Sequence, residues 1–197
     1  MTEPGTPLSR RVGEVVEANS VSFVAQCYQL YDAPPLGSLV RTGEVYGVVC
    51  KVVTEPLDAT RPVLARGEGA ATEEEVFQDN PQLNRLLTSR FEALIAGHDQ
   101  DGVHRQYLPP LPPRVHSFVY PCTPQEVASF TSRLDLLRLL INSGYPMADE
   151  VAGACLREAA PAHPDPDAFL LRAGKALAAE LAGDLPRLNA VLRKLMP

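Results

Sequence analysis

The sequence predicts an α+β fold in which a small N-terminal β-barrel is followed by a C-terminal α-helical bundle. Residues 11–53 hold short, valine-rich segments with a period of two, separated by turn residues, which is typical of strands with one buried face. From residue 123 onward, apolar side chains recur at helical spacing behind helix-capping residues. We therefore expect a flexible tail over residues 1–10, a barrel domain over residues 11–122 and a helical bundle over residues 123–197.

Four strands are expected first, over residues 11–18, 21–30, 37–41 and 45–53. Asn19 and Ser20 form the connection between the first two, and asparagine is common in such turns. Gly47 lies inside the fourth strand, where a bend or bulge would help a barrel to close. Residues 61–66 and 114–120 are predicted as later strands, and we expect the second of these to return to the barrel and close it.

One helix is expected inside the barrel domain, over residues 81–96. Asp79 and Asn80 can cap it, and Pro81 suits its first turn. Its predicted apolar face recurs at helical spacing through Leu83, Leu86, Leu87, Phe91, Leu94 and Ile95.

Four helices are expected in the C-terminal part. The first begins at the capping pattern Thr123-Pro124-Gln125-Glu126 and runs to residue 141. The others are predicted over residues 147–159, from residue 166 to 181, and over 187–195. Short loops between helices of this length are typical of a small α bundle.

Three stretches of the barrel region resemble the HAS-barrel family, the small barrel shared by HerA DNA-translocating ATPases and the catalytic-ring subunits of rotary ATP synthases. They are residues 12–16, 35–40 and 44–49, and the resemblance covers about the first third of the chain. OB-like and SH3-like barrels share much of this pattern and stay open as alternatives. The chain is most similar to stand-alone members, in which helices follow the barrel in place of an ATPase. This resemblance implies a role in assembly.

Composition favours a cytoplasmic protein that is not a strong nucleic-acid binder. The net charge is −6: residues 1–122 hold 15 acids against 10 bases, and residues 123–197 hold 9 acids against 8 bases. Strong nucleic-acid binding depends on basic residues that neutralise phosphates, and this chain has more acidic than basic residues. The sequence predicts no signal peptide and no membrane contact. The four cysteines form no C-x-x-C pair, so we expect free thiols in a reducing compartment.

Nucleotide hydrolysis is not expected, although the resemblance raises it. A phosphate-binding loop needs the pattern G-x-x-x-x-G-K-[ST] after a strand. The chain's one Gly-Lys pair, Gly174-Lys175, precedes Ala176 and lies in a predicted helix.

Metal and nucleophile motifs are also weak. His98, Asp99, Asp101 and His104 lie close together in sequence, but their spacing fits no zinc or EF-hand signature, and a hydrated turn is the favoured interpretation. The sequence contains no G-x-S-x-G motif for nucleophilic catalysis. Cys122 and His116 would share a face only if the predicted strand continued past Pro121, which is not expected. The sequence therefore predicts no catalytic residue, no metal and no cofactor.

The predicted function is that of a non-catalytic interaction or assembly module, whose barrel contacts a protein partner or a second copy of the chain. The candidate contact surface comprises Ser38, Val40, Arg41, Tyr46 and Lys51. The alternative is an accessory DNA-processing factor that binds nucleic acid through the barrel. That alternative rests on Tyr28, Tyr31, Arg41 and Tyr46, which lie on or near the predicted strands.

Overall fold

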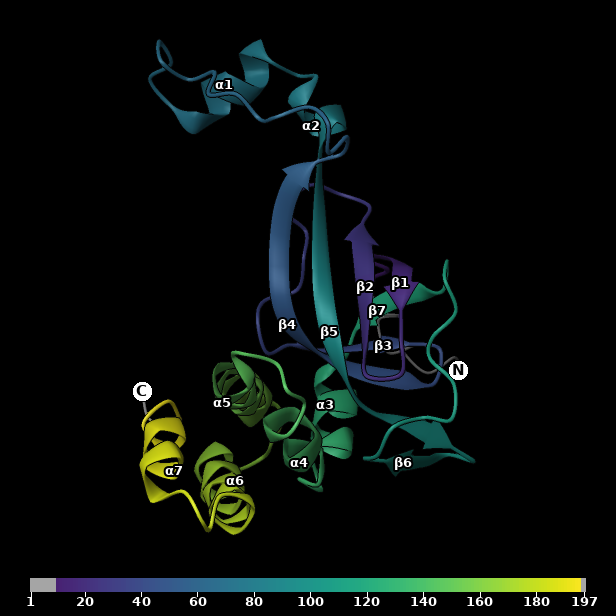
Figure 1. The fold of residues 1–197 in the computed structure, drawn as a ribbon, viewed down its shortest axis with the longest axis vertical. Helices are drawn as coiled ribbons and strands as arrows, with labels where there is room; N and C mark the ends of the chain where they lie inside the picture. The colour runs from purple at the N-terminus through teal and green to yellow at the C-terminus, as the bar shows by residue number, and fades with distance from the viewer. Residues whose placement is uncertain (1–9, 196–197) are drawn as a thin grey trace, which may run out of the picture.

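A computed structural model describes residues 10–195 of the chain (Figure 1). The residues predicted as a flexible tail lie outside this range, except for Arg10. The strands are β1 (Gly13–Ala18), β2 (Ser22–Cys27), β3 (Leu39–Thr42), β4 (Val45–Pro56), β5 (Leu87–Gln100), β6 (Val103–Arg105) and β7 (Phe118–Pro121). The helices are α1 (Glu73–Asp79), α2 (Leu83–Leu86), α3 (Pro124–Phe130), α4 (Leu136–Ile141), α5 (Ala148–Ala159), the 3-10 helix η1 (Ala160–Ala162), α6 (Pro166–Glu180) and α7 (Leu185–Leu192).

Within residues 10–195, six strands form a closed antiparallel barrel. Their order is β2-β1-β7-β3-β4-β5, and the pairing of β2 with β5 closes the ring. The prediction of a barrel in an α+β chain is confirmed. So is the return of a late strand, because β7 pairs with both β1 and β3. The interior is filled by valines and phenylalanines, among them Val15, Phe23, Val40, Phe91 and Val119.

The predicted helix over residues 81–96 is wrong. Only α2 is helical there, and the chain then enters the fourteen-residue strand β5. Phe91, Ala93 and Ile95 belong to the barrel interior, whereas Leu94 and Ala96 pack with the helices outside it. A strand buried on both faces does not alternate between apolar and polar residues. Its apolar residues therefore fell by chance at the spacing of a helix.

Two further predictions need correction. Residues 61–66 form no strand and run as a loop. The single helix predicted from residue 123 to 141 is interrupted between α3 and α4. There the hydroxyl of Thr131 donates to the carbonyl of Val127, and the hydroxyl of Ser132 donates to that of Ser129. Such side-chain bonds compete with the helix backbone and help to end α3.

The helices α3 to α7 share one core with the outer face of the barrel. Leu39, Tyr46, Val48 and Leu94 lie in the same buried cluster as residues of α3, α4, α5, α6 and α7. Figure 1 shows these helices gathered beside one end of β4 and β5. At their other end the same two strands extend past the barrel and carry α1 and α2 away from it. We call residues 54–89, which include the projecting ends of β4 and β5, the arm.

Candidate functional site

The structure places most of the predicted contact surface under the chain's own helices. Val40 points into the barrel and has no exposed surface, and Tyr46 is only 2% exposed. Arg41 is half-buried, with its Nε 3.0 Å from Oε1 of Glu126 on α3. Ser38 is half-buried, and Lys51 alone of the five is exposed. Val40 and Tyr46 therefore have no surface to offer a partner in this fold.

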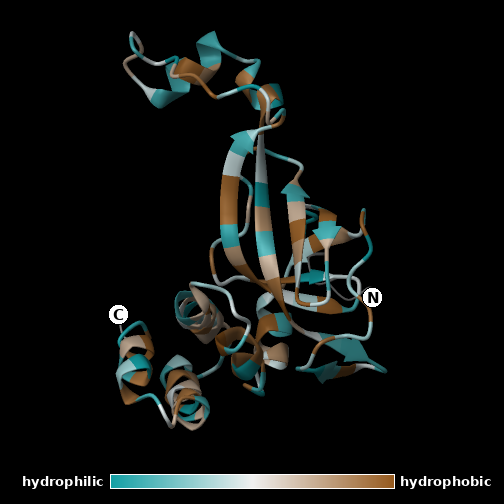
Figure 2. Ribbon diagram, in the orientation of Figure 1, coloured by the Kyte–Doolittle hydropathy of each residue, from teal (hydrophilic) through white to brown (hydrophobic). Residues whose placement is uncertain are grey.

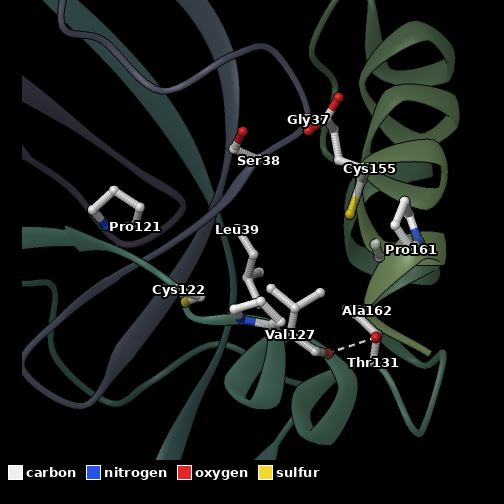
Figure 3. A pocket seen from close by; sticks show the side chains of 13 residues that line it. Gly37, Ser38, Leu39, Pro121, Cys122, Val127, Thr131, Cys155, Pro161 and Ala162 are labelled. Atoms are coloured by element: carbon white, nitrogen blue, oxygen red, sulfur yellow. Dashed lines mark hydrogen bonds between the residues drawn. The ribbon is translucent and has the colours of Figure 1, made fainter. Parts of the chain in front are cut away.

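A hollow of about 250 Å³ lies where Ser38 meets the helices (Figure 3). Cys122 and Cys155 line it from opposite sides, between residues of β3, α3 and α5. Burial, followed by the nearby Glu158, raises the pKa of the Cys155 thiol to about 12. Burial also raises the pKa of Cys122 far above its ordinary value. Both thiols are therefore protonated near neutral pH, and a protonated thiol is a poor nucleophile.

A serine, a histidine and an aspartate from separate elements form a hydrogen-bonded chain at the surface. Nδ1 of His104, on β6, lies 2.5 Å from Oδ1 of Asp99, and Nε2 lies 2.9 Å from Oγ of Ser129 on α3. The hydroxyl of Tyr46 donates to the other Asp99 oxygen over 3.1 Å. Sequence reasoning missed this arrangement, because Ser129 lies twenty-five residues beyond His104 and no motif links them.

The surroundings of Ser129 do not favour acyl transfer. Such chemistry needs hydrogen-bond donors aimed at the oxyanion beside the serine. Ser129 lies in the last turn of α3, where the amides of Val127 and Thr131 already donate to Thr123 and Val127. The C-terminal end of a helix also carries partial negative charge, which disfavours an oxyanion. The network instead joins the β5–β6 hairpin to α3.

The cluster weighed as a metal site is part of that hairpin. Asp101 and Gly102 form its turn, with φ angles of 52° and 74°, whereas His98, Asp99 and His104 lie on β5 and β6. Nδ1 of His98 lies 3.2 Å from the carbonyl oxygen of Tyr107. Over residues 10–195, no group of three or more histidine, cysteine, aspartate or glutamate side chains is placed to hold a metal ion. Gly174 and Lys175 lie inside α6, as predicted.

The arm carries a group of exposed apolar side chains that line one hollow. Leu57, Val63, Leu64 and Leu86 are 59%, 58%, 65% and 41% exposed, and all four line one hollow at the arm's end. Figure 2 shows hydrophobic residues recurring on α1 and α2 at this end, away from the barrel and the other helices. Side chains of this size rarely stay exposed together without a binding role.

We call this hollow the tip groove; its volume is about 130 Å³. It lies between the end of β4, the loop of residues 57–66 and α2. The backbone there is continuous with the sheet, because the Leu57 amide donates to the Leu86 carbonyl over 2.8 Å. The base of the arm is held as well: the Tyr31 amide donates to Oγ of Ser89, and the Tyr31 ring packs edge-on against Phe77 of α1.

The tip groove is basic in an acidic protein. Arg61, Arg66 and Arg85 line it, against the single acid Asp58. Arg61 pairs with Asp58 at 3.2 Å, and both side chains are largely exposed. In the described part of the chain, neither Arg66 nor Arg85 forms an ion pair. The sequence predicted a strand over residues 61–66, whereas the structure has a loop there that lines the tip groove.

Comparison with known proteins identifies no family. No protein-family model matches the chain. No curated protein matches it either. Among the helices of residues 10–195, none has both the length and the apolar character needed to cross a membrane.

Proposed function

We propose that the protein is a non-catalytic interaction and assembly module that contacts a protein partner through the tip groove. The observation that carries this proposal is the exposure of Leu57, Val63 and Leu64 at the end of a projecting arm. In this account the barrel is HAS-like, and helices α3 to α7 form a bundle that covers its outer face. The contact surface thus moves from the barrel wall, where the sequence predicted it, to the arm.

Energetics support a binding role for the arm. Burying one large aliphatic side chain stabilises a complex by about 1.5–3 kcal/mol, so a partner covering several of them gains enough for specific association. The arm also has a rigid base. β4 and β5 pair continuously from Val45↔His98 to Pro56↔Leu87, with bulges after Tyr46 and Val49, so the tip groove is built on a ladder rooted in the barrel.

The test compares tip variants with a matched control. Leu64→Ser removes an apolar side chain that is 65% exposed on the arm, and Leu171→Ser removes one that is 62% exposed on α6. Each tagged variant is purified from cells of the source organism, and co-purifying proteins are quantified. We expect a protein that wild type and Leu171→Ser retain and Leu64→Ser loses. If wild type and both variants retained the same co-purifying proteins, the arm would not be the contact.

Nucleic-acid binding is the second candidate, and the three arginines of the tip groove favour it. Of the four residues considered for this role, Tyr46 is buried and Arg41 is paired with Glu126. Tyr28 and Tyr31 are exposed, but they do not line the tip groove. The net charge of −6 opposes it as well. An electrophoretic shift at low salt, abolished by Arg61→Glu with Arg85→Glu, would establish this candidate over the first.

A further inference from the structure

The loop of residues 62–66 offers unpaired backbone to a partner. In the described residues, the amides of Val63, Leu64, Ala65 and Arg66 donate to no backbone or side-chain acceptor of the chain. The segment lines the tip groove without regular secondary structure, and its sequence predicts a strand. A segment with unpaired amides beside an apolar hollow has features that can bind a peptide by strand addition.

The tip groove restricts what side chains such a peptide can carry. Its volume of about 130 Å³ is comparable with that of one large apolar side chain. Around that hollow, three arginines stand against one aspartate, and Asp58 already pairs with Arg61. The Arg66 guanidinium donates to the side-chain oxygen of Asn80 over 3.5 Å, and in the described residues neither Arg66 nor Arg85 pairs with a carboxylate. Both arginines therefore favour carboxylates on either side of the apolar anchor.

We propose that the tip groove binds an extended acidic segment of a partner protein. The segment pairs its backbone with residues 63–66, inserts one bulky apolar side chain into the hollow and places carboxylates on Arg66 and Arg85. This inference rests on the proposed function and adds the chemistry of the partner. The glutamates at the start of α1 (Glu73, Glu74 and Glu75) do not line the tip groove, so they do not occupy these arginines.

The alternatives fit the tip groove less well. Nucleic acid would use the arginines, but the hollow is walled by aliphatic residues and lacks an aromatic ring on which a base could stack. A second copy of the chain would bring its own arginines to the same place in a two-fold contact, and like charges would then face each other.

The first measurement is fluorescence anisotropy with a labelled peptide, Glu-Val-Glu-Leu-Glu-Val-Glu. Its control, Lys-Val-Lys-Leu-Lys-Val-Lys, keeps the apolar pattern and reverses the charge. We expect the acidic peptide alone to bind, and binding to weaken about tenfold or more in the Arg66→Glu/Arg85→Glu variant and in high salt. Arg172→Glu, on the exposed part of α6, is the matched control and should leave affinity unchanged.

The second measurement is amide hydrogen exchange with and without the acidic peptide. The amides of residues 63–66 should exchange fast in the free protein and become protected in the complex. Protection elsewhere, equal binding of the lysine peptide, or no binding of the acidic one would overturn the proposal. Displacement by a single-stranded oligonucleotide would overturn it in favour of nucleic acid, and a dimer lost in Leu64→Ser would do so in favour of self-association. Loss of the cellular partner in Leu64→Ser without peptide binding would refute this chemistry and leave the interaction role standing.

Discussion

The ring of Tyr46, on β4, stacks on the ring of Phe130, the last residue of α3, with centroids 4.4 Å apart and planes inclined by 23°. This contact joins the barrel to the helices that cover it. Tyr46 also donates its hydroxyl to Asp99, which in turn holds His104. One aromatic pair thus links the barrel wall, the β5–β6 hairpin and α3.

Replacing Tyr46 should therefore destabilise the whole protein. Tyr46→Ala leaves a cavity between two packed layers, and we expect a loss of about 3–5 kcal/mol in the free energy of unfolding. Tyr46→Phe keeps the stack and removes only the hydrogen bond to Asp99, so its expected loss is about 1 kcal/mol. Urea unfolding followed by circular dichroism measures both. Equal losses would mean that the stack contributes little.

Gly37 is a position where the barrel approaches α5 too closely for any side chain. A Cβ there would lie 2.5 Å from the Ala154 carbonyl carbon, and the φ angle is 88°. Gly43 has a similar φ of 57° and nothing within 4 Å, so it serves as the control. We expect Gly43→Ala to cost about 1–2 kcal/mol from backbone strain alone, and Gly37→Ala to cost about 1–3 kcal/mol more from overpacking. Thermal unfolding of the two variants measures the difference. Equal midpoints would contradict the predicted extra cost at Gly37.

Stability should fall at alkaline pH. Burial raises the pKa of Cys27 to about 11 and of Cys50 and Cys155 to about 12, from a value of 9.0. Below about pH 9 these thiols are protonated in both states and contribute no pH dependence. Above it the unfolded chain loses protons that the folded chain keeps, so the free energy of unfolding declines as pH rises. Urea unfolding from pH 7 to 10.5 measures the decline, and serine at all three positions should make it less steep, with Cys122 still contributing.

Ser129 should be unreactive despite its histidine and aspartate. Because the nearby amides of Val127 and Thr131 already donate to backbone carbonyls, we expect a fluorophosphonate probe to label wild type no faster than Ser129→Ala. Ser132→Ala, which removes a neighbouring exposed serine, controls for nonspecific labelling. Labelling that disappears in both Ser129→Ala and His104→Ala would show a working nucleophile, and the protein would then be an enzyme.

The local pattern of apolar and turn residues was enough to predict the barrel. Several of its strands alternate between buried and exposed residues, and turn residues separate them. They failed at β5, where Ala93 and Ile95 face the barrel interior and Leu94 and Ala96 face the helices. Neither the burial of Tyr46 nor the meeting of His104 with Ser129 could be read from the sequence, because both depend on where α3 packs. The tip groove was missed for the opposite reason: Leu57 and Leu64 look like ordinary core residues until the fold shows that nothing covers them.

The most direct test of the interaction role is photocrosslinking in cells from single positions carrying p-benzoylphenylalanine. Position 64 reports on the tip groove, position 51 on the exposed barrel wall and position 171 on α6. We predict a crosslinked protein from position 64 and none from positions 51 and 171. A crosslink from position 51 without one from position 64 would return the contact to the barrel wall, and crosslinks from none of the three would contradict the account.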